Sequence, residues 1–227
     1  MKTKNIVVGL VTIATLSASA GAAAGSIEAN VAIASDYVFR GFSQTDEEPA
    51  ISGGFDYAFD NGFYLGTWAS NVNFGDDASL EWDLYGGYAF DVSENVGLDF
   101  GYIYYVYPGE QDALNYSEFV ASVSFGNLNL GLVYSPDYFG SDADAIVLSS
   151  DYSLSVAKNV GLDLHVGFSD VDEDSFFADG EDSYLDWSAA LTTSVSEIDI
   201  ALTYYGTDLD DIDAADDRVV LSFAKSF

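Results

Sequence analysis

The stretch ASVSFGNLNLGLVY, residues 121–134, alternates apolar and polar residues on both sides of a Gly-Asn pair. Period-two alternation around a two-residue Gly/Asn break predicts a β-hairpin with one apolar face. That face carries Ala121, Val123, Phe125, Leu128, Leu130, Leu132 and Tyr134. The fold depends on whether this face packs inside a soluble β-sandwich or contacts lipid.

The same alternation recurs along the rest of the chain and predicts an all-β protein. We expect twelve strands, near residues 26–40, 50–59, 63–74, 79–92, 96–107, 116–125, 128–135, 144–154, 160–168, 183–195, 198–206 and 218–227. Alternation alone does not say which face of each strand is inside. The connections between the strands carry that information.

Short and long connections alternate along the chain. The short ones are residues 60–62, 93–95, 126–127, 155–159 and 196–197. The others are mostly longer and acidic: 41–49, 108–115, 136–143, 169–182 and 207–217, with 75–78 as the short exception. Bacterial outer-membrane barrels have short periplasmic turns, long external loops and an even number of strands. The pattern therefore predicts a 12-stranded antiparallel transmembrane β-barrel, with a soluble periplasmic β-protein as an alternative.

Aromatic residues on the apolar face favour the membrane barrel. One group precedes the short turns or ends the chain: Phe59, Phe90, Phe125 and Phe227. A second group lies toward the long loops: Tyr37, Phe39, Phe74, Tyr104, Tyr134, Phe168, Trp187 and Tyr204. Two aromatic girdles around an aliphatic middle are typical of a barrel that meets two membrane interfaces. We therefore expect the apolar face of residues 121–134 to contact outer-membrane lipid.

The first 24 residues have the pattern of a secretory signal peptide. A short basic region, MKTKN, precedes the apolar run IVVGLVTIATL and a stretch of small residues suited to cleavage. We expect Sec-dependent export, with residues 25–227 forming a single barrel domain. The exported part keeps four basic and 38 acidic residues, a formal net charge of −34, which disfavours binding to nucleic acid. The chain contains no cysteine, so disulfides cannot stabilise it.

The last ten residues, RVVLSFAKSF (218–227), resemble the C-terminal strand by which outer-membrane proteins are recognised for assembly. Val219, Leu221, Phe223 and the terminal Phe227 are in register. Lys225 departs from the pattern, but near the interface its amine can extend to water. The barrel-assembly machinery is therefore an expected partner.

The stretch ASDYVFRGFSQT (34–45) resembles the hallmark of the Gcw_chp family, also described as TorF-family porins, and LSFAKSF near the C-terminus supports the resemblance. The resemblance implies an outer-membrane β-barrel of a Gram-negative bacterium, with a pore function and no enzymatic activity. It supplies no substrate and no binding residues.

Strand parity directs a mostly acidic set of side chains into the lumen: Asp36, Arg40, Asp56, Glu81, Asp83, Asp99, Glu118, Asp151, Asp163, His165, Asp186, Asp199 and Arg218. An excess of carboxylates in a narrow pore attracts cations and repels anions. We therefore expect a porin for passive, cation-preferring diffusion of small solutes. Long acidic loops could fold in and narrow the pore, so a plugged structural or surface barrel is an alternative.

Arg40 and Arg218 are expected near the long-loop ends of the first and last strands, which must pair if the barrel closes. They would then be neighbours in an acidic pore and set up a transverse field that orients solutes. Equally, Arg40 could form a structural ion pair with Asp36.

An outer-membrane enzyme is a further alternative, for which a Ser or Asp within hydrogen-bond reach of His165, the only histidine, would be needed. Its parity places it on the polar side of its strand, whereas outer-membrane lipid hydrolases use groups on the lipid-facing side. The chain also lacks a Gly-x-Ser-x-Gly motif. We expect a polar lumen residue rather than a catalytic one.

Residues 170–181, DVDEDSFFADGE, place Asp170, Asp172, Asp174 and Glu181 at positions 1, 3, 5 and 12 of an EF-hand-like loop. Ser175 replaces the glycine at position 6, and no flanking helices are expected. A solvated acidic loop is the simpler interpretation, and calcium binding is the alternative. No other cofactor is expected.

Overall fold

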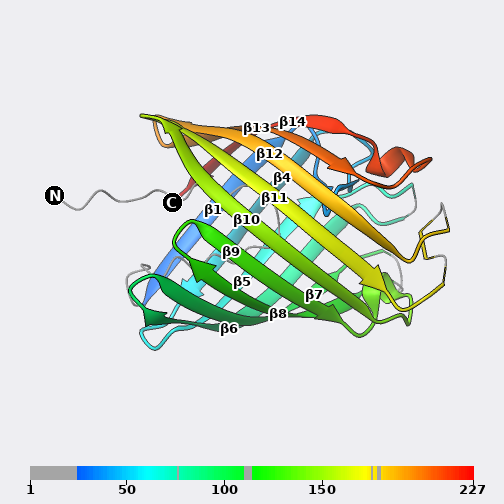
Figure 1. Ribbon diagram of the computed structural model, residues 1–227, viewed down its shortest axis with the longest axis horizontal. Helices are drawn as coiled ribbons and strands as arrows, with labels where there is room; N and C mark the ends of the chain where they lie inside the picture. The colour runs from blue at the N-terminus through cyan, green and yellow to red at the C-terminus, as the bar shows by residue number, and fades with distance from the viewer. Residues whose placement is uncertain (1–24, 76, 110–113, 175, 178–179) are drawn as a thin grey trace.

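The computed structural model describes residues 25–75, 77–109, 114–174, 176–177 and 180–227, so the predicted signal peptide lies outside the described residues. Twelve antiparallel strands form one closed barrel (Figure 1). They are β1 Ser26–Ala34, β4 Ala50–Ala58, β5 Phe63–Asn71, β6 Leu80–Ser93, β7 Val96–Val106, β8 Tyr116–Phe125, β9 Leu128–Ser135, β10 Ala145–Ala157, β11 Val160–Val171, β12 Ser183–Val195, β13 Ile198–Thr207 and β14 Arg218–Ser226. The described part of the chain holds no helix long and apolar enough to cross a membrane.

The barrel closes between its first and last strands. β1 pairs with β4 on one side and with β14 on the other, so that Ile33 has Ile51 and Phe223 as its two register partners. Each remaining strand pairs with the strands before and after it in the sheet. Closure leaves no unpaired sheet edge, which a lipid environment requires. The predicted fold class, a 12-stranded antiparallel transmembrane barrel, is confirmed.

The hairpin at residues 121–134 forms as its sequence predicts. Phe125 at the end of β8 pairs with Leu128 at the start of β9. Gly126 takes a φ of 59°, which a side chain would disfavour and which the first central residue of a type II′ turn adopts. The side chains of Leu130 and Leu132 are 44% and 45% exposed on the outside of the barrel. The apolar face therefore points to the surroundings rather than to a core.

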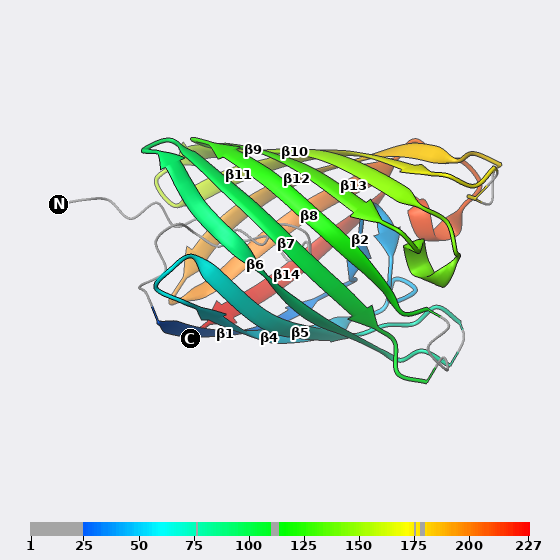
Figure 2. The same ribbon diagram turned by 90° about the horizontal axis from the view of Figure 1, so that it is seen from below.

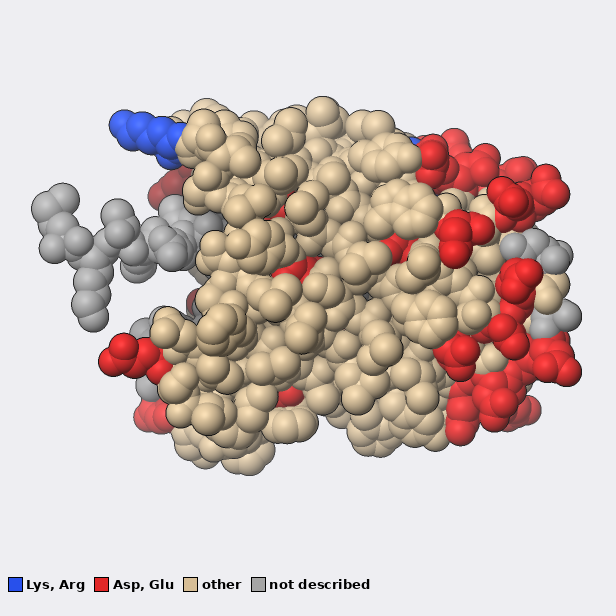
Figure 3. Space-filling model, in the orientation of Figure 1, with Lys and Arg blue, Asp and Glu red and all other residues tan. Residues whose placement is uncertain are grey.

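The outer surface is apolar around the middle of the barrel and acidic at one end. Figure 3 shows a broad band with few charged residues at its surface, with most of the Asp and Glu gathered where the long connections lie. Phe90 and Phe125 are exposed near the short turns, whereas Tyr104, Tyr134 and Tyr204 are exposed toward the long connections. This arrangement matches the two aromatic girdles of a membrane barrel.

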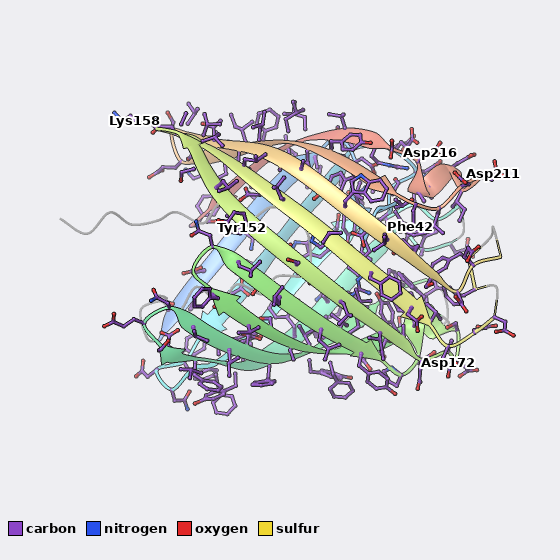
Figure 4. The ribbon with its side chains drawn as sticks, viewed as in Figure 1. Phe42, Tyr152, Lys158, Asp172, Asp211 and Asp216 are labelled. Atoms are coloured by element: carbon purple, nitrogen blue, oxygen red, sulfur yellow. The ribbon has the colours of Figure 1, made fainter. Side chains whose placement is uncertain are left out.

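The two ends of the barrel differ in their connections, and we call them the short-turn end and the long-loop end. Lys158 lies at the short-turn end, whereas Asp211 and Asp216 lie at the long-loop end (Figure 4). At the turn between β12 and β13, Ser196 and Glu197 both take positive φ values, 53° and 64°, as a type I′ turn requires. Among its described residues, the long-loop end carries two short 3₁₀ helices, η1 Tyr138–Gly140 and η2 Asp213–Ala215.

The first strand is shorter than the alternation predicts. We expected it to run to residue 40, with Tyr37 and Phe39 facing lipid, but β1 ends at Ala34 and these side chains are only 3% and 4% exposed. Beyond Ala34 there is no strand to pair with on one side, because its partner Ala50 is the first residue of β4. The chain instead turns into the barrel.

Residues 35–49, which we call the inner segment, connect β1 to β4. The segment contains a small hairpin of β2, Val38–Phe39, and β3, Phe42–Ser43 (Figure 2). Arg40 and Gly41 between them take positive φ values of 48° and 85°. The prediction also fails at Phe74, because β5 ends at Asn71 and the ring of Phe74 packs against that of Tyr107.

Candidate functional site

The inner segment lies across the lumen at the long-loop end and bonds to several walls of the barrel. The Tyr37 hydroxyl donates to Glu81 on β6 at 2.8 Å. Arg40 donates to Glu118 on β8. On β12, the Tyr184 hydroxyl donates to the backbone carbonyl of Arg40 at 2.9 Å. Because these strands lie on different sides of the barrel, only a segment inside the lumen can reach all three.

Arg40 and Glu118 form a bidentate ion pair. Nη1 and Nη2 of Arg40 lie 2.7 and 2.9 Å from the two carboxylate oxygens of Glu118, and both side chains are buried. The guanidinium carbon lies 4.5 Å from the ring centre of Phe39 and 5.8 Å from that of Tyr138. Burial lowers the pKa of the guanidinium, but Glu118 and neighbouring groups raise it, so the net pKa is above its usual value. The charge on Arg40 therefore persists at physiological pH.

A second ion pair holds the start of the inner segment. Arg218 at the start of β14 donates to Asp36 at 3.1 Å, and Asp36 also accepts hydrogen bonds from the hydroxyls of Ser43 and Thr45. Arg218 is further fixed by the backbone carbonyls of residues 213, 214 and 216. The alternative pairing of Arg40 with Asp36 is therefore wrong: Asp36 takes Arg218, and Arg40 reaches across the lumen.

Aromatic rings fill the space around the inner segment. Tyr105 and Tyr116, on β7 and β8, stack with their ring centres 4.4 Å apart, and Phe39 packs against Tyr105. On the opposite side of the segment, Phe42 packs against Phe177 and Tyr184. A cavity of about 20 Å³ lies beside the segment, between Asp36, Trp68 and their neighbours, and has room for about one water molecule. The long-loop half of the lumen is thus closed in this conformation.

Tyrosine hydroxyls, rather than cations, satisfy several of the interior carboxylates. Tyr64 donates to Asp99, Tyr85 donates to Asp56, and Tyr107 joins Tyr37 on Glu81. These bonds add no positive charge to the lumen, because a phenol is a neutral donor. The lumen therefore keeps an excess of carboxylates over its cations.

Asp83 is the exception among these carboxylates. Its side chain is 1% exposed, and neither of its oxygens has a hydrogen-bond partner among the described residues. Its register neighbours are Trp68 on β5 and Tyr105 on β7. A buried carboxylate without a partner is costly, so this position calls for a positive group or a proton.

His165 on β11 lies between two carboxylates. Its Nδ1 is 2.7 Å from Asp151 on β10, and its Nε2 is 3.0 Å from Asp186 on β12. Because an ionised carboxylate only accepts hydrogen bonds, two such carboxylates favour the imidazolium form of the ring, in which both nitrogens donate. Such a ring has no free lone pair with which to activate a nucleophile, so the geometry does not favour catalysis.

None of the side chains expected in the lumen is exposed at the outer surface. Those that are buried are Asp36, Arg40, Glu81, Asp83, Asp99, Glu118 and Asp186. Those that are half-buried are Asp56, Asp151, Asp163, His165, Asp199 and Arg218. The structure thus gathers the set inside the barrel, and its role in lining a conducting path stays a prediction.

The proposed calcium loop is only partly described, because Ser175 and residues 178–179 lie outside the described residues. Asp170 is still part of β11, where it pairs with Ser183, so the loop begins later than the motif. In the described part of the chain, no three metal-binding side chains gather closely enough to hold an ion. Calcium binding at Asp170, Asp172, Asp174 and Glu181 stays a prediction.

Sequence reasoning missed the interior tyrosines. Tyr116 has the same strand parity as Glu118, and Tyr184 has the same parity as Asp186, so both could have been placed inside by the rule used for the acids. Tyr105 follows Tyr104 directly and must face the opposite way. The parity rule that places the acids inside the barrel therefore places these tyrosines there as well.

A family model described as "Bacterial protein of unknown function (Gcw_chp)" matches residues 18–227. The chain belongs to the Gcw_chp family. The resemblance drawn from ASDYVFRGFSQT (34–45) is therefore confirmed, and almost all of that stretch lies in the inner segment. The feature by which this Gcw_chp chain was recognised is thus the part that closes its lumen.

Solved structures of porins share the fold of the Gcw_chp chain. The "KdgM porin" superposes with a TM-score of 0.56 at 11% identity, and the match covers 88% of this chain and 98% of that one. The NanC porin gives the same TM-score and coverage at 9% identity. At such low identity these matches show a common barrel fold and nothing more. No protein of curated function matches the chain.

Proposed function

We propose that this Gcw_chp barrel is an outer-membrane porin whose lumen is closed by the inner segment, and that small cations diffuse through it when the segment moves. The observation that carries the proposal is the ion pair between Arg40 and Glu118, which ties the segment across the lumen. The segment is also held by the packing of Tyr37, Phe39 and Phe42 against rings of the wall and loops, so these contacts must break together with the ion pair before a solute can pass. The porin fold of the neighbours supports the same assignment.

The preference for cations follows from the charges inside the barrel. Each interior cation is already matched: Arg40 by Glu118, Arg218 by Asp36, and His165 by two aspartates. Carboxylates such as Glu81, Asp83 and Asp99 remain in excess. In a narrow channel with low-dielectric walls, such an excess raises the local concentration of cations and repels anions.

The outer surface supports the location in the membrane. A belt of exposed aliphatic side chains surrounds the barrel, and its partners would be lipid chains. The C-terminal strand β14 closes the barrel against β1, as a strand recognised by the barrel-assembly machinery should. Export through the Sec pathway of a Gram-negative bacterium belongs to the same proposal.

A second candidate function is a structural or surface barrel that never conducts. The packed rings around Tyr105, Tyr116 and Phe39 favour it, because they fill the long-loop half of the lumen. The two candidates differ in one respect: in a porin the segment leaves the lumen, and in a plugged barrel it stays.

Planar-bilayer recording of the purified protein and of Arg40→Ala tests the proposal. The substitution breaks the ion pair and should raise the open fraction or the conductance above that of the wild-type protein. Lys158→Ala is the matched control, because it removes an exposed cation at the short-turn end, opposite the end where the inner segment lies. If neither the wild-type protein nor Arg40→Ala conducts, the barrel is plugged.

A further inference from the structure

The contacts of Arg40 describe a binding site for a guanidinium group. Glu118 accepts hydrogen bonds from both terminal nitrogens of the guanidinium. The Tyr105 hydroxyl holds the carboxylate in place by donating to its Oε2 atom at 3.0 Å. The ring of Tyr138 lies beside the guanidinium carbon. Glu118, Tyr105 and Tyr138 belong to the barrel wall and its loops, not to the inner segment. They would therefore remain in place if Arg40 withdrew.

Asp83 lies next to this site and is a candidate partner for a second positive group. Tyr105 on β7 is the register partner of Asp83 on β6, and its hydroxyl contacts Glu118 on β8, so the two carboxylates flank one tyrosine. Both oxygens of Asp83 lack a partner in the described structure although the side chain is buried. Tyr37 of the inner segment packs against Trp68, the other register neighbour of Asp83. Withdrawal of the segment would thus open space on this side of Asp83.

We propose that the open lumen binds solutes that carry a guanidinium and a second cationic group, with the guanidinium on Glu118 and the second group on Asp83. In the closed barrel, Arg40 occupies the guanidinium position as an internal ligand. The proposal rests on the proposed function, since the solute reaches the site only when the inner segment moves.

The chemistry of the site selects for a guanidinium over an ammonium. A planar fork can donate two parallel hydrogen bonds to a carboxylate and stack beside an aromatic ring, whereas an ammonium is a compact point charge with a tighter hydration shell. A solute must also compete with Arg40, which is attached to the barrel and present at a high effective concentration. A second contact, to Asp83, gives the solute an interaction that Arg40 lacks.

The test uses Arg40→Gly in the full chain, purified in detergent. Arg40 has a positive φ of 48°, which glycine adopts without strain, so this variant removes the side chain and keeps the backbone. Agmatine, a guanidinium linked to a primary ammonium, should raise the midpoint of thermal unfolding in a saturable way relative to NaCl of equal ionic strength. Methylguanidinium and 1,4-diaminobutane should each raise it less. The wild-type protein should respond less than the variant, because Arg40 competes.

Two double variants assign the contacts. Adding Glu118→Gln should abolish the agmatine shift, and adding Asp83→Asn should reduce it to that of methylguanidinium. The proposal is overturned if agmatine acts no better than NaCl, if its shift survives Glu118→Gln, or if Asp83→Asn leaves its advantage unchanged. Arg40→Ala serves as a second background if Arg40→Gly does not fold.

The same measurements separate this proposal from the proposed function. The thermal shift requires no conductance, so binding without current would leave the site standing and reject the porin. Current without an agmatine shift would support the porin and reject the guanidinium site. In the wild-type channel, agmatine should also raise the open fraction more than 1,4-diaminobutane at equal concentration, and an equal effect of the two would reject the guanidinium site.

Discussion

Arg40 and Glu118 lie 78 residues apart in sequence, and their ion pair spans the lumen of the barrel. Arg40 belongs to the connection that follows β1, whereas Glu118 is on β8, and β4, β5, β6 and β7 separate these two strands on the shorter way around the sheet. The pair therefore connects the segment that follows β1 to the nearly opposite wall of the barrel. It is one of several contacts that hold residues 35–49 inside the lumen.

The first prediction concerns the energy of this pair. Glu118 is 1% exposed, so Arg40→Met leaves a buried carboxylate without its counter-charge and should lower the free energy of unfolding by about 3–5 kcal/mol. Combining it with Glu118→Leu removes the orphan charge, and the double variant should be more stable than Arg40→Met alone. Urea unfolding of the protein in lipid vesicles measures both effects. If the two substitutions add independently, the residues are not coupled as the structure indicates.

The second prediction concerns the lipid face. Leu130 and Leu164 are exposed near the middle of β9 and β11, where an arginine would face hydrocarbon. Leu130→Arg and Leu164→Arg should each cost about 2–4 kcal/mol of folding free energy in a bilayer. Asp172→Arg, at an exposed position of the long-loop end, is the control and should have little effect. Equally small effects at all three positions would argue against lipid contact.

The third prediction concerns orientation in the membrane. The chain has no cysteine, so single cysteines can be introduced at Asp211 and Lys158, which lie at opposite ends of the barrel (Figure 4). A membrane-impermeant maleimide should label Asp211→Cys on intact cells, because long loops of such barrels face outward. Lys158→Cys should be labelled only after the outer membrane is permeabilised. The reverse pattern would mean that the barrel is inverted.

The fourth prediction concerns ion selectivity. Channels of Arg40→Ala in a KCl gradient should show a reversal potential shifted toward that of K⁺, because interior carboxylates outnumber the remaining cations. The shift should weaken at high salt, since the Debye length falls to about 3 Å at 1 M. Glu81→Gln combined with Asp83→Asn should reduce it further. An unselective or anion-selective pore at low salt would show that these carboxylates do not line the path.

Strand alternation predicted most of the barrel because lipid on one face of each strand and a polar interior on the other require different residue types. Side chains such as Leu130 face lipid and those such as Asp99 face a polar interior, so each strand reveals its faces with period two. The alternate short turns then fix the topology. Consequently eleven of the twelve predicted strands lie close to their observed positions, and the first differs in its length.

The inner segment could not be predicted in the same way. Tyr37 and Phe39 continue the alternation of β1, so the pattern runs on without a break after the backbone has left the sheet. The end of β1 is set instead by where β4 begins and by distant partners, Glu118 for Arg40 and Arg218 for Asp36. Such contacts between residues far apart in the chain leave no local trace in the sequence.

The central claim, that residues 35–49 close a conducting barrel, is tested most directly by removing them. Ala34 and Ala50 are register partners at the ends of β1 and β4, so a two-residue Asn-Gly turn can join these strands in place of the inner segment. The twelve strands that form the barrel are otherwise unchanged. In planar bilayers this variant should show a stable conductance well above that of the wild-type protein. Identical conductance in the two proteins, or none in either, would contradict the account.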